Sequence, residues 1–178
     1  MLTLLQGSEI ALVSLEEAKN HLRLDHSYDD EYLLSLIQTA TDYVENYLKK
    51  SVMAKLWKLV GTPEIRADGL SYLKLPNFPI LEIISVKRIH RESSQVIKRY
   101  CLEQKKAQPE ICIYGDGSPI EVVYRAGYGN QPKHIPPSVF QSVLIIAAEM
   151  YENRTILPME NNNLVQALLA PYRVMGVA

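Results

Sequence analysis

The chain has 178 residues, of which 47% are apolar, and it carries 19 Lys and Arg against 20 Asp and Glu. These values predict one globular domain, with room for a subdomain. The longest apolar run, 143–148, is far too short to span a bilayer. Residues 1–5 lack the basic flank and cleavage site of a signal peptide. We therefore expect synthesis in the cytosol.

The two cysteines exclude a disulfide framework. Cys101 and Cys112 flank a turn expected over 104–109, which makes them candidate neighbours on adjacent strands. In a reducing cytosol we expect two free thiols without a role.

The near-neutral total conceals an uneven distribution of charge. Residues 1–54 carry four Lys and Arg against nine Asp and Glu, residues 55–135 carry thirteen against eight, and residues 136–178 carry two against three. The basic middle indicates either affinity for nucleic acid, or complementarity between neighbouring copies, or merely solvated strand faces. It contains no dense Lys/Arg run, and few aromatic residues stand beside the charges, which weakens the nucleic-acid interpretation.

The N-terminal third predicts an extended arm over 1–12 and then two helices. Ser14 and Glu17 form a capping-box pattern that opens a helix over 14–24. Asp29 or Asp30 is expected to cap a second helix, over 29–50. Apolar residues recur in it at helical spacing, so one face should be buried. Its core members are expected to include Leu33, Ile37 and Val44.

Beyond residue 52 the periodicity changes to that of strands. Antiparallel strands are expected over 56–60, 72–75, 83–89, 96–102, 111–114 and 120–125, separated by Gly and Pro turn signals. The prolines around Phe78 argue against regular structure over 77–80. The segment 127–130, with Gly127 and Gly129, is interpreted as the turn that closes this region.

The C-terminal third returns to helices. Pro136 and Pro137 open one over 137–153, with Val143, Ala147 and Met150 on its inner face. The Asn triplet 161–163 caps a short helix over 163–169 that Pro171 stops. The predicted fold class is therefore α+β. A bundle of about four helices, from 1–54 and 127–178, carries an inserted antiparallel β subdomain over 55–126.

No pattern in the chain indicates catalysis. The four histidines lack metal-type spacing, and the acidic residues 25–31 lack the alternation and turn glycine of a calcium loop. No serine lies in a nucleophile elbow, and the two glycines of 127–129 lack the lysine and helix start of a phosphate site. We therefore expect no catalytic residue, no metal and no cofactor.

Several short motifs, in this order, resemble those of the head–tail connector (adaptor) proteins of long-tailed double-stranded DNA bacteriophages. The first group is Ser14–Lys19 with Leu22–Asp25, the acidic start Asp29–Asp30, and Val44–Tyr47. The second group is Val122–Gly129, Ile135–Pro136, Tyr151–Arg154 and Leu168–Arg173. The resemblance spans about 13–174, and the strand-rich middle is similar to the longer branch of the family rather than to its all-helical form.

The resemblance implies a structural, non-enzymatic protein of the virion neck. Such proteins form a homo-oligomeric ring, dodecameric on the portal, which extends the DNA channel and docks neck or tail-completion proteins. DNA would pass through without sequence-specific binding, and no membrane is involved. The apolar C-terminal segment is the candidate interface, with the residues Tyr172, Arg173, Val174 and Met175. It either folds back onto its own helices or reaches a neighbour.

Two other functions stay open at this stage. One is a nucleic-acid-binding protein that uses the basic middle. Salt-dependent retention of the isolated monomer on duplex DNA would favour this function. The other is a small hydrolase, for which a deep pocket with converging polar groups would speak.

Overall fold

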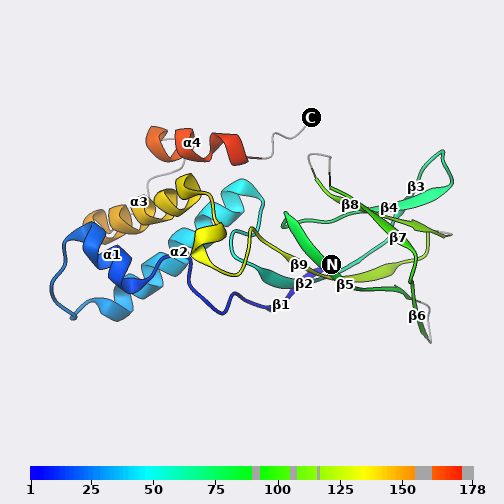
Figure 1. The fold of residues 1–178 in the computed structure, drawn as a ribbon, viewed down its shortest axis with the longest axis horizontal. Coiled ribbons are helices and arrows are strands. Elements are labelled where there is room, and N and C mark those ends of the chain that lie inside the picture. The colour runs from blue at the N-terminus through cyan, green and yellow to red at the C-terminus, as the bar shows by residue number, and fades with distance from the viewer. Residues whose placement is uncertain (90–92, 105–107, 116, 155–161, 174–178) are drawn as a thin grey trace. The chain divides into compact units, whose positions relative to one another are not determined.

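The computed structural model describes residues 1–89, 93–104, 108–115, 117–154 and 162–173 (Figure 1). Within them lie four α-helices and nine strands in two antiparallel sheets, which confirms the predicted α+β class. The chain divides into two compact units. The helical unit comprises Glu9–Met53 and Gly129–Val174, and the strand unit comprises Met1–Ser8 and Ala54–Tyr128. The first eight residues thus belong with the strands, whereas the sequence had grouped them with the helices.

The first helix, α1 (Leu15–Leu22), begins at the capping box that the sequence predicted. The Glu17 amide donates to Ser14 Oγ at 3.2 Å, and the Ser14 amide donates to Glu17 Oε2 at 2.8 Å. Two otherwise unpaired amides are satisfied in this way. The helix ends at Leu22, two residues before the expected end, and its C-cap Arg23 adopts a left-handed conformation (φ 57°).

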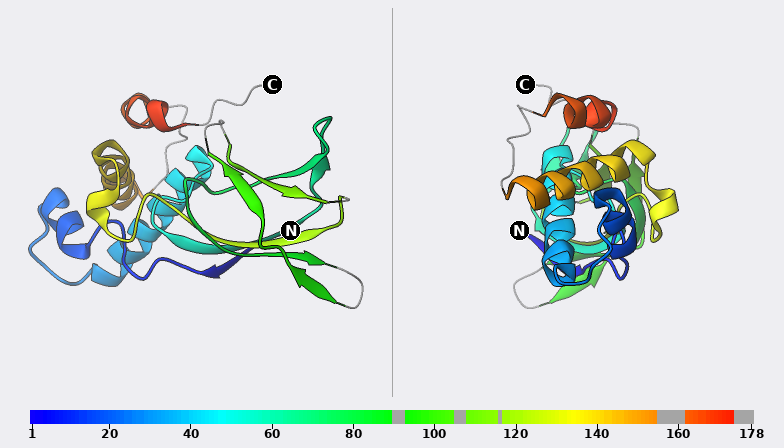
Figure 2. Two further views of the ribbon diagram at one scale, coloured as in Figure 1. Left: turned by 45° about the vertical axis from the view of Figure 1, so that its right-hand side comes forward. Right: turned by 90° about the vertical axis from the view of Figure 1, so that its left-hand side faces the viewer.

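The other three helices lie close to their expected bounds: α2 (Asp30–Leu48), α3 (Pro137–Asn153) and α4 (Asn163–Leu169). The side chain of Asn162 caps α4 by accepting the Val165 amide at 3.1 Å. Helix α3 packs on α2, α1 and α4, and Figure 2 shows it crossing α2. No helix in the described part of the chain is long and apolar enough to cross a membrane.

Apolar stripes of α2 and α3 form the core of the helical unit. The six residues that the sequence placed there are all buried, which confirms the expectation: Leu33, Ile37, Val44, Val143, Ala147 and Met150. The buried hydroxyls of Thr41 and Ser142 donate to carbonyl groups one turn back in their own helices. Both buried hydroxyls therefore have a hydrogen-bond partner.

The strand unit is built of two antiparallel sheets. The first has the order β1-β2-β9-β5-β6 and the second β3-β4-β8-β7. In the first sheet the bounds are β1 (Leu2–Gln6), β2 (Lys55–Gly61), β9 (Ile120–Ala126), β5 (Ile80–Ile89) and β6 (Ser94–Val96). In the second they are β3 (Glu64–Ile65), β4 (Leu70–Lys74), β8 (Glu110–Tyr114) and β7 (Tyr100–Glu103). One buried cluster draws residues from both sheets, so the sheets pack face to face.

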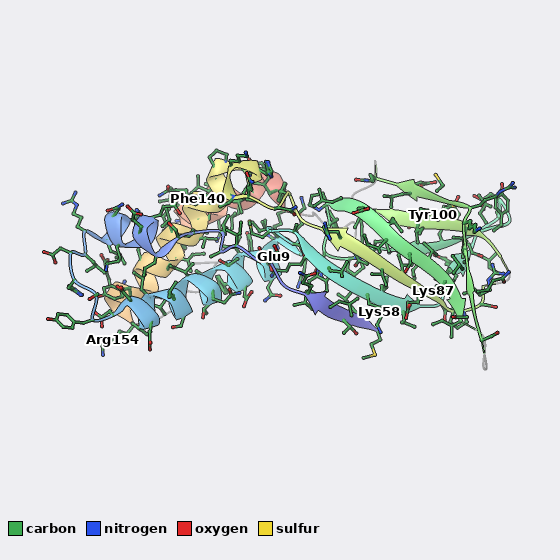
Figure 3. All side chains as sticks on the ribbon, turned by 60° about the horizontal axis from the view of Figure 1, so that its bottom comes forward. Glu9, Lys58, Lys87, Tyr100, Phe140 and Arg154 are labelled. Atoms are coloured by element: carbon green, nitrogen blue, oxygen red, sulfur yellow. The ribbon has the colours of Figure 1, made fainter. Side chains whose placement is uncertain are left out.

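Strand β9 lies at the centre of the first sheet and alternates buried with half-buried residues. Its Tyr124 is fully buried, and the hydroxyl donates to the Pro76 carbonyl at 2.9 Å. On the opposite, outward face, Lys58 and Lys87 (Figure 3) each lie 4.0 Å from the carboxylate of Glu121. The alternation predicted from sequence therefore separates core and solvent faces here.

The structure differs from the sequence expectation in several strands. The arm over 1–12 contains strand β1, which pairs with β2. The strand expected over 96–102 is two strands in different sheets, because the chain crosses from one sheet to the other between Val96 and Tyr100. Strand β5 begins at Ile80, directly after the cis peptide Phe78–Pro79, and β3 was not expected at all.

The base of the insertion is a short parallel bridge between Met53 and Gly129. A Cβ atom at Gly129 would lie 2.4 Å from His134 Nδ1, so the close approach requires glycine. Gly127 has φ 140°, a conformation that other residues rarely adopt. These glycines serve a turn, as the sequence indicated.

Candidate assembly surfaces

One polar contact joins motifs at opposite ends of the chain, and a second joins α1 to the start of α2. The Tyr151 hydroxyl on α3 donates to Asp29 Oδ2 at 2.7 Å, and Lys19 Nζ lies 2.8 Å from Asp30 Oδ1. Asp29 occupies the N-cap position of α2, but its side chain makes no capping hydrogen bond. The expectation that this carboxylate caps the helix is therefore corrected: it holds Tyr151 instead, and this hydrogen bond raises the pKa of the Tyr151 phenol.

The candidate interface at the C-terminus is described only in part. After α4 a short 3₁₀ turn, Ala170–Tyr172, continues the chain. Tyr172 is half-buried, and the exposed guanidinium of Arg173 lies 5.0 Å from the centre of the Tyr47 ring on α2. Up to Arg173 the segment therefore lies on its own helical unit. Val174 and Met175 lie outside the described residues.

A basic groove of about 530 Å³ lies where β5, β6 and β8 approach each other. Its cations are Arg88, Lys98 and Arg99, and its wall includes the exposed Tyr114. Arg88 Nη2 donates to the Tyr114 carbonyl at 2.8 Å, which links β5 of the first sheet to β8 of the second. The excess of Lys and Arg over 55–135 was the sequence signal for such a surface, but the residues were not singled out.

An ion pair between the partly exposed Arg66 and the buried Glu110 lies at the second sheet. Arg66 binds Glu110 through two hydrogen bonds, of 2.6 and 3.0 Å, and its guanidinium lies 4.0 Å from the centre of the Tyr72 ring. Tyr72 in turn donates to Asp68 Oδ2 at 2.7 Å. That hydrogen bond, together with the Leu70 amide, lowers the pKa of Asp68, and the bond to Asp68 raises the pKa of Tyr72. We interpret this group as structural because the ions pair with each other.

Cys101 and Cys112 are directly opposite each other on β7 and β8, as neighbours on adjacent strands should be. Both are free thiols. Burial raises the pKa of the Cys112 thiol, which disfavours the reactive thiolate.

One groove in the helical unit has titratable side chains in its lining. A groove of about 330 Å³ is lined by His21 and by the carboxylates of Glu149 and Glu152, and Asn162 Nδ2 donates to Glu149 at 3.1 Å. Among the described residues, no group of three or more His, Cys, Asp and Glu side chains could hold a metal ion.

The structure defines a helical unit and a unit of two antiparallel sheets. The chain belongs to the family of phage gp6-like head–tail connector proteins, whose model matches residues 12–173. Its fold is similar to those of several solved chains, three of which each have 22% identity and cover 100% of this chain and 97% of the other. They come from the neck of an empty gene transfer agent (GTA) particle computed with C6 symmetry (TM-score 0.84), the virion of the native GTA particle (0.82) and the native neck computed with C12 symmetry (0.79). None of the curated proteins matches the chain.

Proposed function

We propose that the protein is a non-enzymatic connector of the virion neck that forms a ring beneath the portal. The ring would extend the DNA channel and offer a docking face to neck or tail proteins. The observation that carries this proposal is the joint match to the connector family over residues 12–173 and to neck proteins over the whole chain.

The ring is supported by the symmetry of the similar assemblies. Their necks are computed with six-fold and twelve-fold symmetry. A twelve-membered ring is compatible with both, because a twelve-fold axis contains a six-fold one. Such a ring needs two different, complementary patches on each copy rather than one self-complementary patch.

The charge distribution supplies candidate patches. Residues 1–54, which contain α1 and α2, carry an excess of acidic residues, and residues 55–135 an excess of basic ones. The basic groove brings together three cations of this region, Arg88, Lys98 and Arg99. We propose that it faces the acidic helices of a neighbouring copy.

Assembly is therefore expected to weaken as salt is raised. Exposed ion pairs are screened over about 10 Å at 0.1 M salt and about 3 Å at 1 M. The double variant Lys98→Glu, Arg99→Glu should raise the concentration needed for assembly roughly two- to thirtyfold at low salt, at roughly 0.2–1 kcal/mol per exposed pair. Sedimentation and electron microscopy of the purified protein, over a range of concentration and salt, measure this.

The control is Lys49→Glu, which makes half of that charge change at an exposed position of the acidic, helical unit. It should leave assembly unchanged or strengthen it. A wild-type protein that stays monomeric at every concentration and salt, with and without the portal, would overturn the ring.

The C-terminal segment is proposed to provide a further assembly contact, with Tyr172 and Arg173 as anchors and Val174 and Met175 continuing it. Tyr and Arg are enriched among residues that dominate binding energy at interfaces. The position of Arg173 over Tyr47 equally suits a segment that merely folds back.

Deletion of 171–178 separates these two roles. If the segment is an assembly contact, the shortened protein keeps its thermal unfolding midpoint but no longer joins capsids to tails. A lowered midpoint would mean that the segment belongs to the fold of its own subunit. Normal particles made with the shortened protein would exclude the assembly role.

The basic groove also keeps a second candidate function open, that of a nucleic-acid-binding protein. Three cations beside an exposed tyrosine resemble a surface that follows a phosphate backbone. The isolated monomer would then be retained on duplex DNA with an affinity that falls steeply with salt. Retention that persists in the Lys98→Glu, Arg99→Glu variant would assign DNA binding to another surface.

A further inference from the structure

Strand β1 forms an open, uncharged edge of the five-stranded sheet. Among the residues that the structure describes, it pairs with β2 alone, and it is the outermost strand. Residues 1–8 contain neither a charged residue nor a proline. Proteins usually protect exposed edges with charges, prolines or bulges, because open edges pair with other chains. The bulge in β1 lies between Leu4 and Gln6, so the stretch before it is unprotected.

The direction of the free backbone groups follows from the register. The Val60 amide donates to the Met1 carbonyl, so residues 1 and 60 form a hydrogen-bonded pair. In an antiparallel ladder such pairs recur at every second residue, and here Thr3 and Lys58 are the next pair. The amides and carbonyls of Leu2 and Leu4 therefore point away from β2, toward the open edge.

The side chains of Leu2 and Leu4 continue the inner face of the sheet. One cross-strand row runs from Val86 through Val122 and Leu59 to Leu2. Its first three members are buried, but Leu2 is 37% exposed. The apolar inner face of the sheet therefore continues onto β1, where its side chains are no longer buried.

A second row leads to the same result. It runs from Ile83 through Tyr124 and Trp57 to Leu4, and Tyr124 is fully buried whereas Leu4 is 46% exposed. Leu2 and Leu4 thus present apolar side chains beside outward-pointing backbone groups. A surface of this kind fits an added extended segment, which gains backbone hydrogen bonds and apolar contact together.

We propose that a neighbouring copy of this chain adds an extended segment to the β1 edge, so that the edge is one half of the subunit contact in the ring. This inference rests on the proposed ring. A second copy is the occupant because each member of a ring has a neighbour on both sides. Nucleic acid fits poorly, because residues 1–8 carry no charged side chain to meet a phosphate, and the N-terminal ammonium already donates to the Val60 carbonyl. The neighbour contributes a surface other than its own β1, since a ring contact joins two different patches.

Two substitutions at Leu4 test the edge. Leu4→Pro removes only the outward-pointing amide, and Leu4→Lys places a charge on the exposed apolar row. Both variants should stay monomeric at concentrations where the wild type assembles, in low and high salt alike, because apolar contact is not screened. In wild-type assemblies, residue-resolved hydrogen exchange should show the Leu2 and Leu4 amides protected, whereas in the monomer only that of Thr3 is protected.

The matched control is Ile65→Lys, which adds the same charge at an exposed apolar residue (56%) of an edge strand in the other sheet. It should assemble as the wild type does. All variants should unfold close to the temperature of the monomeric wild type, since Leu4 and Ile65 are both exposed in the monomer.

The outcomes separate this inference from the ring itself. If the wild type and both Leu4 variants all form rings, the β1 edge is not a contact, and the proposed function stands. If the wild type forms no ring, both this inference and the proposed function are overturned.

Mixtures of wild type and Leu4→Lys give a further test. A variant copy keeps one of its two patches intact, so it should bind the end of a growing wild-type assembly and stop it as an open arc. Wild-type dimers that exclude the variant would instead mean that β1 pairs with β1, which contradicts the proposal.

Discussion

Truncation of Ile37 or Leu144 to alanine is expected to lower the free energy of unfolding by about 2–5 kcal/mol. Ile37 on α2 and Leu144 on α3 are both buried in the helical unit. Each substitution removes apolar contacts and leaves a cavity that the neighbouring helices fill only partly. Urea unfolding followed by far-ultraviolet circular dichroism measures the loss, because the helices dominate that signal.

Leu34→Ala is the matched control for Ile37. Leu34 lies on the same helix but is 46% exposed, so its truncation should change stability by less than about 0.5 kcal/mol. Equal effects of Ile37→Ala and Leu34→Ala would show that α2 does not bury the face described.

Tyr124→Ala is expected to cost about 3–5 kcal/mol in the strand unit, as for other large aromatic residues in a core. Tyr124 is fully buried at the centre of the first sheet and donates to the Pro76 carbonyl. Tyr124→Phe keeps the ring and should cost only about 0.5–1.5 kcal/mol, for the lost hydrogen bond. The fluorescence of Trp57, the single tryptophan and the residue directly opposite Tyr124, reports the unfolding.

Tyr114→Ala is the control, because Tyr114 belongs to the same unit but is largely exposed. A loss for Tyr124→Phe as large as that for Tyr124→Ala would mean that the hydroxyl, rather than the packed ring, dominates. Burial also raises the pKa of the Tyr124 phenol. Above about pH 10 the phenol ionises more readily in the unfolded chain, so the stability that it contributes is lost as the pH rises.

Local patterns in the sequence determined the helices. The Ser14–Glu17 capping box, the Asn162 cap and Pro137 at the first turn of α3 act within four residues, so the sequence displays them directly. The apolar spacing of Ile37 and Val143 identified the buried faces for the same reason. The order of the short motifs was sufficient to indicate the connector family, to which the chain belongs.

Only the tertiary structure decided where Asp29 directs its carboxylate, because its partner Tyr151 lies 122 residues away. The same holds for the division of 94–103 between two sheets and for the pairing of β1 with β2. Strand partners and registers depend on contacts between residues far apart in the chain, which a local pattern does not contain. From the sequence, residues Met1–Gln6 therefore predicted only an extended arm. The register of β1 shows that Leu2 and Leu4 continue the apolar inner face of the sheet but remain exposed.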